Sequence, residues 1–143
     1  MVLGYNLFVI LWGAFVRASG SGAGCGDHWP LCEGALIPPT PTLTTLVELF
    51  HRATSGVALV LVFMLFTRAR RAFGPTHPAR HAAVASLVLI VIEALIGAVI
   101  VRASLFGDNA SIARAFTIGA HFVNTLILLG ALSLTVWFAR SAQ

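Results

Sequence analysis

Four apolar stretches, each about long enough to cross a bilayer, take up most of this chain. They cover residues 2–17, 43–67, 82–102 and 114–139. Hydrocarbon offers no partners for unpaired backbone groups, so each stretch is expected to form a helix. The pattern predicts an all-α membrane protein, in which residues 1–143 form a single transmembrane domain, a bundle of four helices.

Three polar connections join the predicted helices. Residues 18–42 form a loop that is rich in Gly and Pro and contains both cysteines, and residues 103–111 form a short loop at the same end. The loop 68–81 carries four arginines, and we expect it in the cytoplasm because basic residues gather on that side of a membrane. Both termini are then cytoplasmic, and the cysteine-containing loop lies outside the cell membrane.

A weak internal repeat accompanies this layout. Residues 13–19 and 97–104 share a Gly-Ala start and an Arg-Ala-Ser end, with one residue inserted in the second segment. Each segment ends a helix and precedes a helix that carries a histidine. The pattern indicates two pseudo-repeated helical hairpins, related by an axis along the membrane normal. Chance similarity between small and apolar residues is the alternative.

Composition agrees with a membrane protein and narrows the possible functions. The chain is 58% hydrophobic and 10% charged, with a net charge of +4 and a mean hydropathy of +0.92. A soluble domain carries about 25% charged residues, so a soluble globule and a disordered chain are both excluded. All nine basic residues are arginines that bracket the helices, so no nucleic-acid-binding patch is expected.

His51 and His121 lie at matching depths on two helices that run in the same direction. Each lies about 10 Å below the outer end of its helix. Two imidazoles at one depth suit axial ligation of a heme iron between the helices. Hydrogen bonding between helices is the alternative. A zinc site is not expected, because no set of three or four ligands converges there.

Four arginines lie near the outer face, where the distribution of basic residues across membranes does not favour them. They are Arg17, Arg52, Arg102 and Arg114. Because Arg pairs with carboxylates in a bidentate manner, all four are candidates to bind heme propionates. Arg114 lies two turns outward from His121 on the same face. The alternative is that these side chains reach toward lipid phosphates.

Two acidic residues lie within the predicted helices. Glu48 shares a face with His51, so it could handle protons beside a heme, or it could form a structural ion pair with Arg52. Glu93 lies near mid-membrane without a partner in its own helix. It is a candidate for a proton path or for a neutral hydrogen-bonding residue.

Cys25 and Cys32 form a C-x6-C pair in the outer loop. An oxidising compartment favours a disulfide bond between them. Such a bond would stabilise the loop by about 2–4 kcal/mol. A redox-active thiol pair is the alternative, although the spacing differs from C-x-x-C.

Three motifs in this order resemble those of heme A synthases. They are the Gly-rich loop with two cysteines at residues 20–32, E-x-x-H-R at residues 48–52, and Gly-Ala-His at residues 119–121. The resemblance implies an oxidoreductase that converts heme O to heme A for cytochrome oxidase maturation. The C8 methyl group would become a formyl group through successive hydroxylations and loss of water.

The resemblance also implies roles for single residues. His51 and His121 would be the heme ligands, Glu48 would be a catalytic acid, and Cys25 and Cys32 would form a loop disulfide. Typical members have eight helices in two halves, and this chain matches the N-terminal half, which resembles the substrate site. The C-terminal half of such members holds a heme b.

Cofactors and partners follow from the same resemblance. The expected cofactors are heme b, heme O or heme A, and a homodimer or higher homo-oligomer could rebuild the eight-helix arrangement. The expected partners are heme O as substrate, a heme O synthase, an electron donor and the lipid bilayer. One alternative is a heme-binding membrane cytochrome or heme carrier without oxidation activity. Another is a four-helix membrane thiol oxidase.

Overall fold

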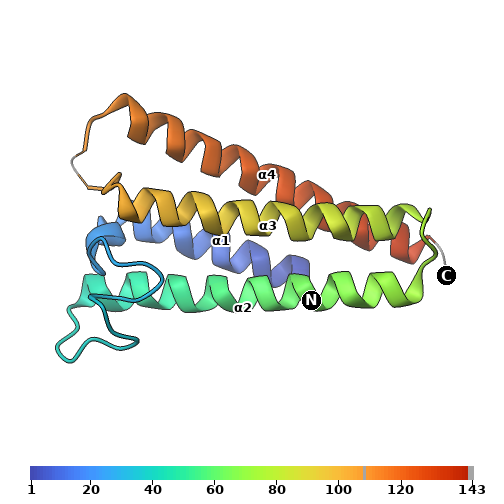
Figure 1. Cartoon of the computed structure of the whole chain (residues 1–143), viewed down its shortest axis with the longest axis horizontal. Coiled ribbons are helices and arrows are strands. Elements are labelled where there is room, and N and C mark those ends of the chain that lie inside the picture. Colours follow the sequence, from blue (N-terminus) through green and yellow to red (C-terminus); the bar gives the residue numbers. More distant parts are fainter. Residues whose placement is uncertain (108, 142–143) are drawn as a thin grey trace.

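The computed structural model of the chain is all-helical and describes residues 1–107 and 109–141. Its elements are α1 (Val2–Ala18), the short 3-10 helix η1 (Ser21–Ala23), α2 (Leu43–Ala72), α3 (Pro78–Arg102) and α4 (Ile112–Arg140). Consecutive α-helices run in opposite directions along one long axis (Figure 1). The predicted all-α class is confirmed.

Contacts between the helices close a ring. α1 packs on α2, α2 on α3, α3 on α4, and α4 on α1, so that α2 and α4 face one another across the ring. We define the cysteine loop as residues 19–42. Toward the end that carries this loop, α4 diverges from α3 (Figure 1). α1 lies beside the loop half of α2, where the Tyr5 hydroxyl donates to the Thr54 carbonyl and the Trp12 indole to the Val47 carbonyl.

Three of the helices, α2, α3 and α4, are long and apolar enough to cross a membrane. α1 has 17 residues, somewhat fewer than the roughly 20 of a typical span. Large apolar side chains such as Phe63, Val88 and Leu126 are exposed on the described surface. Contiguous apolar surface of this kind is typical of a protein that contacts lipid.

Two helices extend further than predicted at the end opposite the cysteine loop. α2 continues to Ala72 and α3 begins at Pro78, so the predicted loop 68–81 shrinks to residues 73–77. Arginines in the last turn of α2 complement the helix dipole, and His77 caps α3 with Pro at its first position. The arginines expected in a loop therefore lie in helix ends. α1 and α4 end within two residues of their predicted bounds.

An apolar cluster near the middle of the bundle joins all four α-helices. Its buried members are Val9, Ala58, Val62, Ile90, Leu128 and Leu132. His51, Glu93 and His121 each lie on the cysteine-loop side of the cluster residues in their own helices. These three residues therefore occupy the half of the bundle in which α4 diverges (Figure 1).

Candidate functional site

Two histidines lie between the apolar cluster and the cysteine loop. His51 of α2 and His121 of α4 are both half-buried. The His51 ring packs against α1 at Gly13, where an added Cβ would lie 2.8 Å from the ring Cε1. Any larger residue at position 13 would have to displace the ring.

Three buried side-chain nitrogens find no hydrogen-bond partner within residues 1–107 and 109–141. They are Nδ1 of His51, Nδ1 of His121 and Nε of Arg114. Buried polar groups are normally paired, so each exception requires a reason. The residues that carry these nitrogens are three of those that the sequence marks as candidates to hold a heme.

Glu93 of α3 is engaged by side chains of α4. Its Oε2 accepts a hydrogen bond from Nδ2 of Asn124 at 2.5 Å, and its Oε1 accepts one from the Thr125 hydroxyl. Oε1 also lies 3.2 Å from Nδ1 of His121. That distance is close enough for an ion pair, although a proton on Nδ1 would not point straight at the oxygen. The partners of Glu93 thus come from the neighbouring helix.

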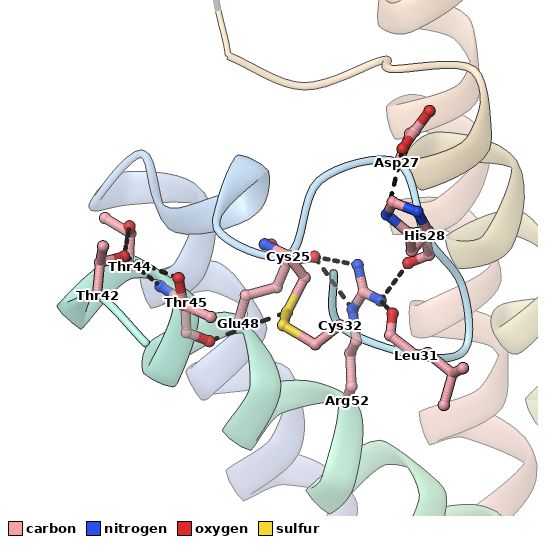
Figure 2. The surroundings of a disulfide bond; sticks show 10 residues. All are labelled: Cys25, Asp27, His28, Leu31, Cys32, Thr42, Thr44, Thr45, Glu48 and Arg52. Carbon is pink, nitrogen blue, oxygen red and sulfur yellow. Dashed lines mark hydrogen bonds and ion pairs between the residues drawn. A yellow bond between two sulfur atoms is a disulfide. The ribbon is translucent and has the colours of Figure 1, made fainter. Parts of the chain in front are cut away.

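The cysteine loop packs closely on the start of α2. The Sγ atoms of Cys25 and Cys32 lie 2.00 Å apart, which is the distance of a disulfide, and both residues are fully buried (Figure 2). At Gly24, an added Cβ would lie 2.4 Å from the carbonyl oxygen of Thr44. The two backbones therefore approach so closely that position 24 has no room for a side chain.

An ion pair within α2, between Glu48 and Arg52, also binds the loop, because both side chains hydrogen-bond to the loop backbone. Oε1 of Glu48 lies 2.5 Å from NH2 of Arg52, and Oε2 accepts the Cys25 N–H at 2.8 Å. NH1 of Arg52 donates to the carbonyls of His28 and Leu31, each at 2.6 Å (Figure 2). The Glu48 side chain is only 5% exposed. Of the two roles open to Glu48, its contacts match the structural ion pair.

The four outer arginines differ in their surroundings. Arg52 uses four of its five N–H groups on α2 and the cysteine loop. Arg102 is exposed and donates to the Trp29 carbonyl at 3.3 Å. Arg17 is exposed, and its side chain has no hydrogen bond to the described residues. Arg114 is half-buried and keeps an unpaired Nε. Of these four arginines, Arg114 is therefore the one whose buried Nε–H lacks a hydrogen-bond partner among the described residues.

An apolar hollow lies between α3 and α4, in the half of the bundle where these two helices diverge (Figure 1). Leu95 and Val99 line it from α3, and Phe116 and Ala120 line it from α4. Apolar walls with a few polar groups nearby are typical of small-molecule sites. The described residues contain no group of three or more His, Cys, Asp and Glu that could hold a bare metal ion. A porphyrin iron needs only two axial ligands from the protein.

Three residues of the site were not predicted from the sequence: Gly13, Asn124 and Thr125. Asn124 lies at membrane depth, three residues after His121, and its polarity there was a usable signal. Gly13 carried no comparable signal, because its contact with His51 depends on how α1 packs on α2.

Comparison with known proteins supplies relatives for the whole chain. A family model described as cytochrome oxidase assembly protein matches residues 1–143. A protein of Thermus thermophilus named protoheme IX farnesyltransferase is 51% identical, over 96% of this chain and 23% of that protein. A heme A synthase of Geobacillus kaustophilus is 39% identical, over 90% of this chain and 38% of that protein.

A further heme A synthase, from Staphylococcus haemolyticus, is 43% identical over 84% of this chain and 37% of its own length. The chain thus spans about two fifths of these heme A synthases and about a quarter of the farnesyltransferase. The resemblance carried by the loop, E-x-x-H-R and Gly-Ala-His motifs is confirmed. Because the family model matches its full length, the chain belongs to the family of cytochrome oxidase assembly proteins.

Proposed function

We propose that this chain binds an iron porphyrin between α2 and α4 and acts in the conversion of heme O to heme A. One observation carries the proposal: the rings of His51 and His121 make no hydrogen bond to the described residues, and Arg114 keeps an unpaired buried Nε. Two imidazoles can supply both axial ligands of a porphyrin iron, and a guanidinium can pair with a propionate. The reaction is inferred from relatives that are named heme A synthase.

Each side chain has a defined task in this proposal. His51 and His121 bind and orient the porphyrin, and Arg114 holds a propionate toward the cysteine-loop end. The apolar hollow between α3 and α4 excludes water and offers an apolar surface for the substrate. The bound heme supplies the oxidation chemistry, and the protein supplies position and environment. The chain is then an oxidoreductase, and both the electron donor and the oxygen source for the hydroxylations are separate partners.

The substrate assignment has support of its own. A segment 51% identical to this chain forms part of a protein named protoheme IX farnesyltransferase. The product of a farnesyltransferase that acts on protoheme is a farnesylated heme. Heme O is therefore the proposed substrate, and a heme O synthase is a proposed partner.

We also propose a homodimer in the cell membrane, which would place two four-helix units together. Both termini are cytoplasmic in this proposal, and the cysteine loop is extracytoplasmic. Five arginines support that orientation, because they lie toward the end of the bundle opposite the loop and basic residues favour the cytoplasmic side. They are Arg68, Arg70, Arg71, Arg80 and Arg140.

A second candidate is a heme carrier or cytochrome that performs no oxidation. The contacts of Glu48 favour it, because both carboxylate oxygens are already engaged by Arg52 and the Cys25 N–H. A thiol oxidase has less support, since both cysteines are fully buried.

Identification of the bound pigment tests the proposal. The protein is purified in mild detergent from heme-replete cells, and the pigment is extracted with acid acetone and identified by mass and by pyridine hemochrome spectrum. We expect heme O, heme A or a hydroxylated intermediate, and we expect His51→Ala and His121→Ala to lose the low-spin spectrum. His81→Ala, an exposed histidine at the other end of the bundle, is the matched control.

The alternatives give different results in the same experiment. Heme b alone, with no conversion of added heme O, would favour the carrier. Absence of any heme from folded protein would contradict the proposed function. The variant Glu48→Gln adds a second discriminator, since loss of conversion with retained heme would indicate a catalytic acid.

A further inference from the structure

Glu93 is held in one orientation by hydrogen bonds from two side chains of α4, and each of these side chains is itself fixed by a backbone carbonyl. Asn124 donates to Oε2, and the same amide donates to the Leu89 carbonyl at 2.9 Å. The Thr125 hydroxyl lies against Oε1 and against the His121 carbonyl at 2.9 Å. The side chain of Glu93 is 19% exposed. A carboxylate held at both oxygens has little rotational freedom, so its position relative to His121 is well defined.

The His121 ring turns one specific nitrogen toward this carboxylate. Nδ1 lies 3.2 Å from Oε1 of Glu93 and is buried. The contact is not a hydrogen bond as it stands, and rotation of the ring would align an Nδ1–H with the oxygen. A proton held on Nδ1 leaves Nε2 of a neutral imidazole unprotonated. An unprotonated Nε2 is the form of histidine that can bind iron.

We propose that Glu93 is a positioning residue for His121: it accepts a hydrogen bond from Nδ1–H and thereby presents Nε2 to the porphyrin iron. The inference rests on the proposed function and adds to it. Metal-binding histidines commonly donate their second N–H to a carboxylate, which fixes the tautomer and the ring orientation and raises the basicity of the ligand.

The same arrangement makes the two histidine ligands unequal. His51 has no carboxylate at Nδ1 within the described residues, and its ring is located instead by close contact with Gly13. In the predicted repeat Gly13 corresponds to Gly97, so Glu93 corresponds to Val9, a buried apolar residue. The structure therefore assigns the more basic ligand to α4.

The tautomer of His121 tests the contact without heme. The heme-free full chain is labelled with 15N-histidine in detergent, and the His121 signals are identified by their loss in His121→Gln. We expect the proton on Nδ1 in the parent protein. In Glu93→Met, which removes the acceptor at similar volume, we expect a shift toward the Nε2–H tautomer. The His51 signals should keep their positions.

The heme-loaded protein provides the second readout. Heme affinity should fall on the order of 10- to 100-fold in Glu93→Met. The midpoint potential should rise in both Glu93→Met and Glu93→Gln, because a negative partner of the ligand stabilises the oxidised iron. Affinity should recover in part in Glu93→Gln, whose amide oxygen can still accept. Ser86→Ala removes another buried polar group of α3 and should match the parent.

Some results would contradict the role of Glu93 alone, and others would also contradict the proposed function. If the parent binds low-spin heme but carries the His121 proton on Nε2, or if Glu93→Met keeps the parental affinity and potential, this inference fails and the proposed function stands. A parent protein that binds no heme overturns both. Should Glu93→Met fail to fold, the parental tautomer and the Glu93→Gln potential still decide the question.

Discussion

Most polar side chains at membrane depth in this molecule are paired. Glu48 has Arg52 and the Cys25 N–H, and Glu93 has Asn124 and Thr125. Polar groups in an apolar medium are costly unless they are hydrogen-bonded. Against this background, the rings of His51 and His121 and the Nε of Arg114 are informative, because they make no hydrogen bond to the described residues and so leave capacity for a ligand.

Replacement of Arg114 should weaken heme binding selectively. Arg114→Gln removes a charged donor, and a hydrogen bond to a charged group contributes about 1.5–3 kcal/mol. We therefore expect the Kd for heme, measured by absorbance titration, to rise about 10- to 100-fold. Arg17→Gln, at an exposed arginine, is the matched control and should change it little. Equal effects of the two variants would refute the distinction between these arginines.

The contact between Gly13 and His51 predicts a specific steric effect. The new Cβ of Gly13→Ala would lie 2.8 Å from Cε1 of the ring, so the ring has to move. We expect a loss of stability of about 1–3 kcal/mol and an altered low-spin spectrum. Gly56→Ala in α2 has open space around the new Cβ and should preserve both properties. An unchanged spectrum in Gly13→Ala would show that His51 is not held by this contact.

At the scale of elements, the cysteine loop and α2 behave as one unit. The loop has little regular structure, yet its cysteines are buried and its carbonyls accept from Arg52. The capping threonine of α2, Thr42, accepts the Thr45 N–H and fixes where the helix begins. The position of the helix therefore determines where the loop can be held.

Removal of Arg52 should loosen this unit. Arg52→Met leaves Glu48 buried without its charged partner, and such breaks cost about 3–5 kcal/mol. Denaturant-induced unfolding in detergent should show a loss of this size. The double variant Glu48→Gln/Arg52→Met should recover part of it, because no uncompensated charge remains. Arg68→Met, at an exposed arginine of α2, should have little effect. A double variant as unstable as the single one would contradict the ion-pair explanation.

At the scale of the molecule, the bundle closes around an apolar cluster and opens toward the cysteine loop. The four helices pack together at the apolar cluster, whereas α4 diverges from α3 in the half of the bundle that carries the cysteine loop (Figure 1). Gly97, the repeat partner of Gly13, has nothing within 4 Å of an added Cβ, whereas Gly13 contacts a histidine. The two hairpins thus pack differently at this position, and the internal repeat stays a prediction.

A ligand in the open half should stabilise the whole molecule. At a heme concentration 100 times the Kd, binding adds about 2.7 kcal/mol to the free energy of unfolding. Heme-replete protein should therefore unfold at a higher temperature than heme-free protein, as measured by circular dichroism. His51→Ala/His121→Ala should lose this increment and His81→Ala should keep it. If the double variant kept the full increase in unfolding temperature, the heme would bind at a site other than the two histidines.

The amino-acid sequence by itself determined the helical class and the four helices, and it predicted a matched depth for His51 and His121. Those features follow from hydropathy and from the rise of a helix, which are local properties. The end of α2 and the start of α3 lie beyond the predicted bounds, because the apolar stretches stop near the arginines although Arg is a good helix former. The cap and the Pro at the start of α3 were available local signals.

Only the tertiary structure decided which polar groups are already engaged. It joined Arg52 to the cysteine loop, Glu93 to Asn124 and Thr125, and Gly13 to His51. These contacts cross 21 to 38 residues of chain, and each depends on the angle and register at which helices or loops pack. Helical periodicity places a side chain on a face of its own helix, but it does not determine which side chain of another element meets it there.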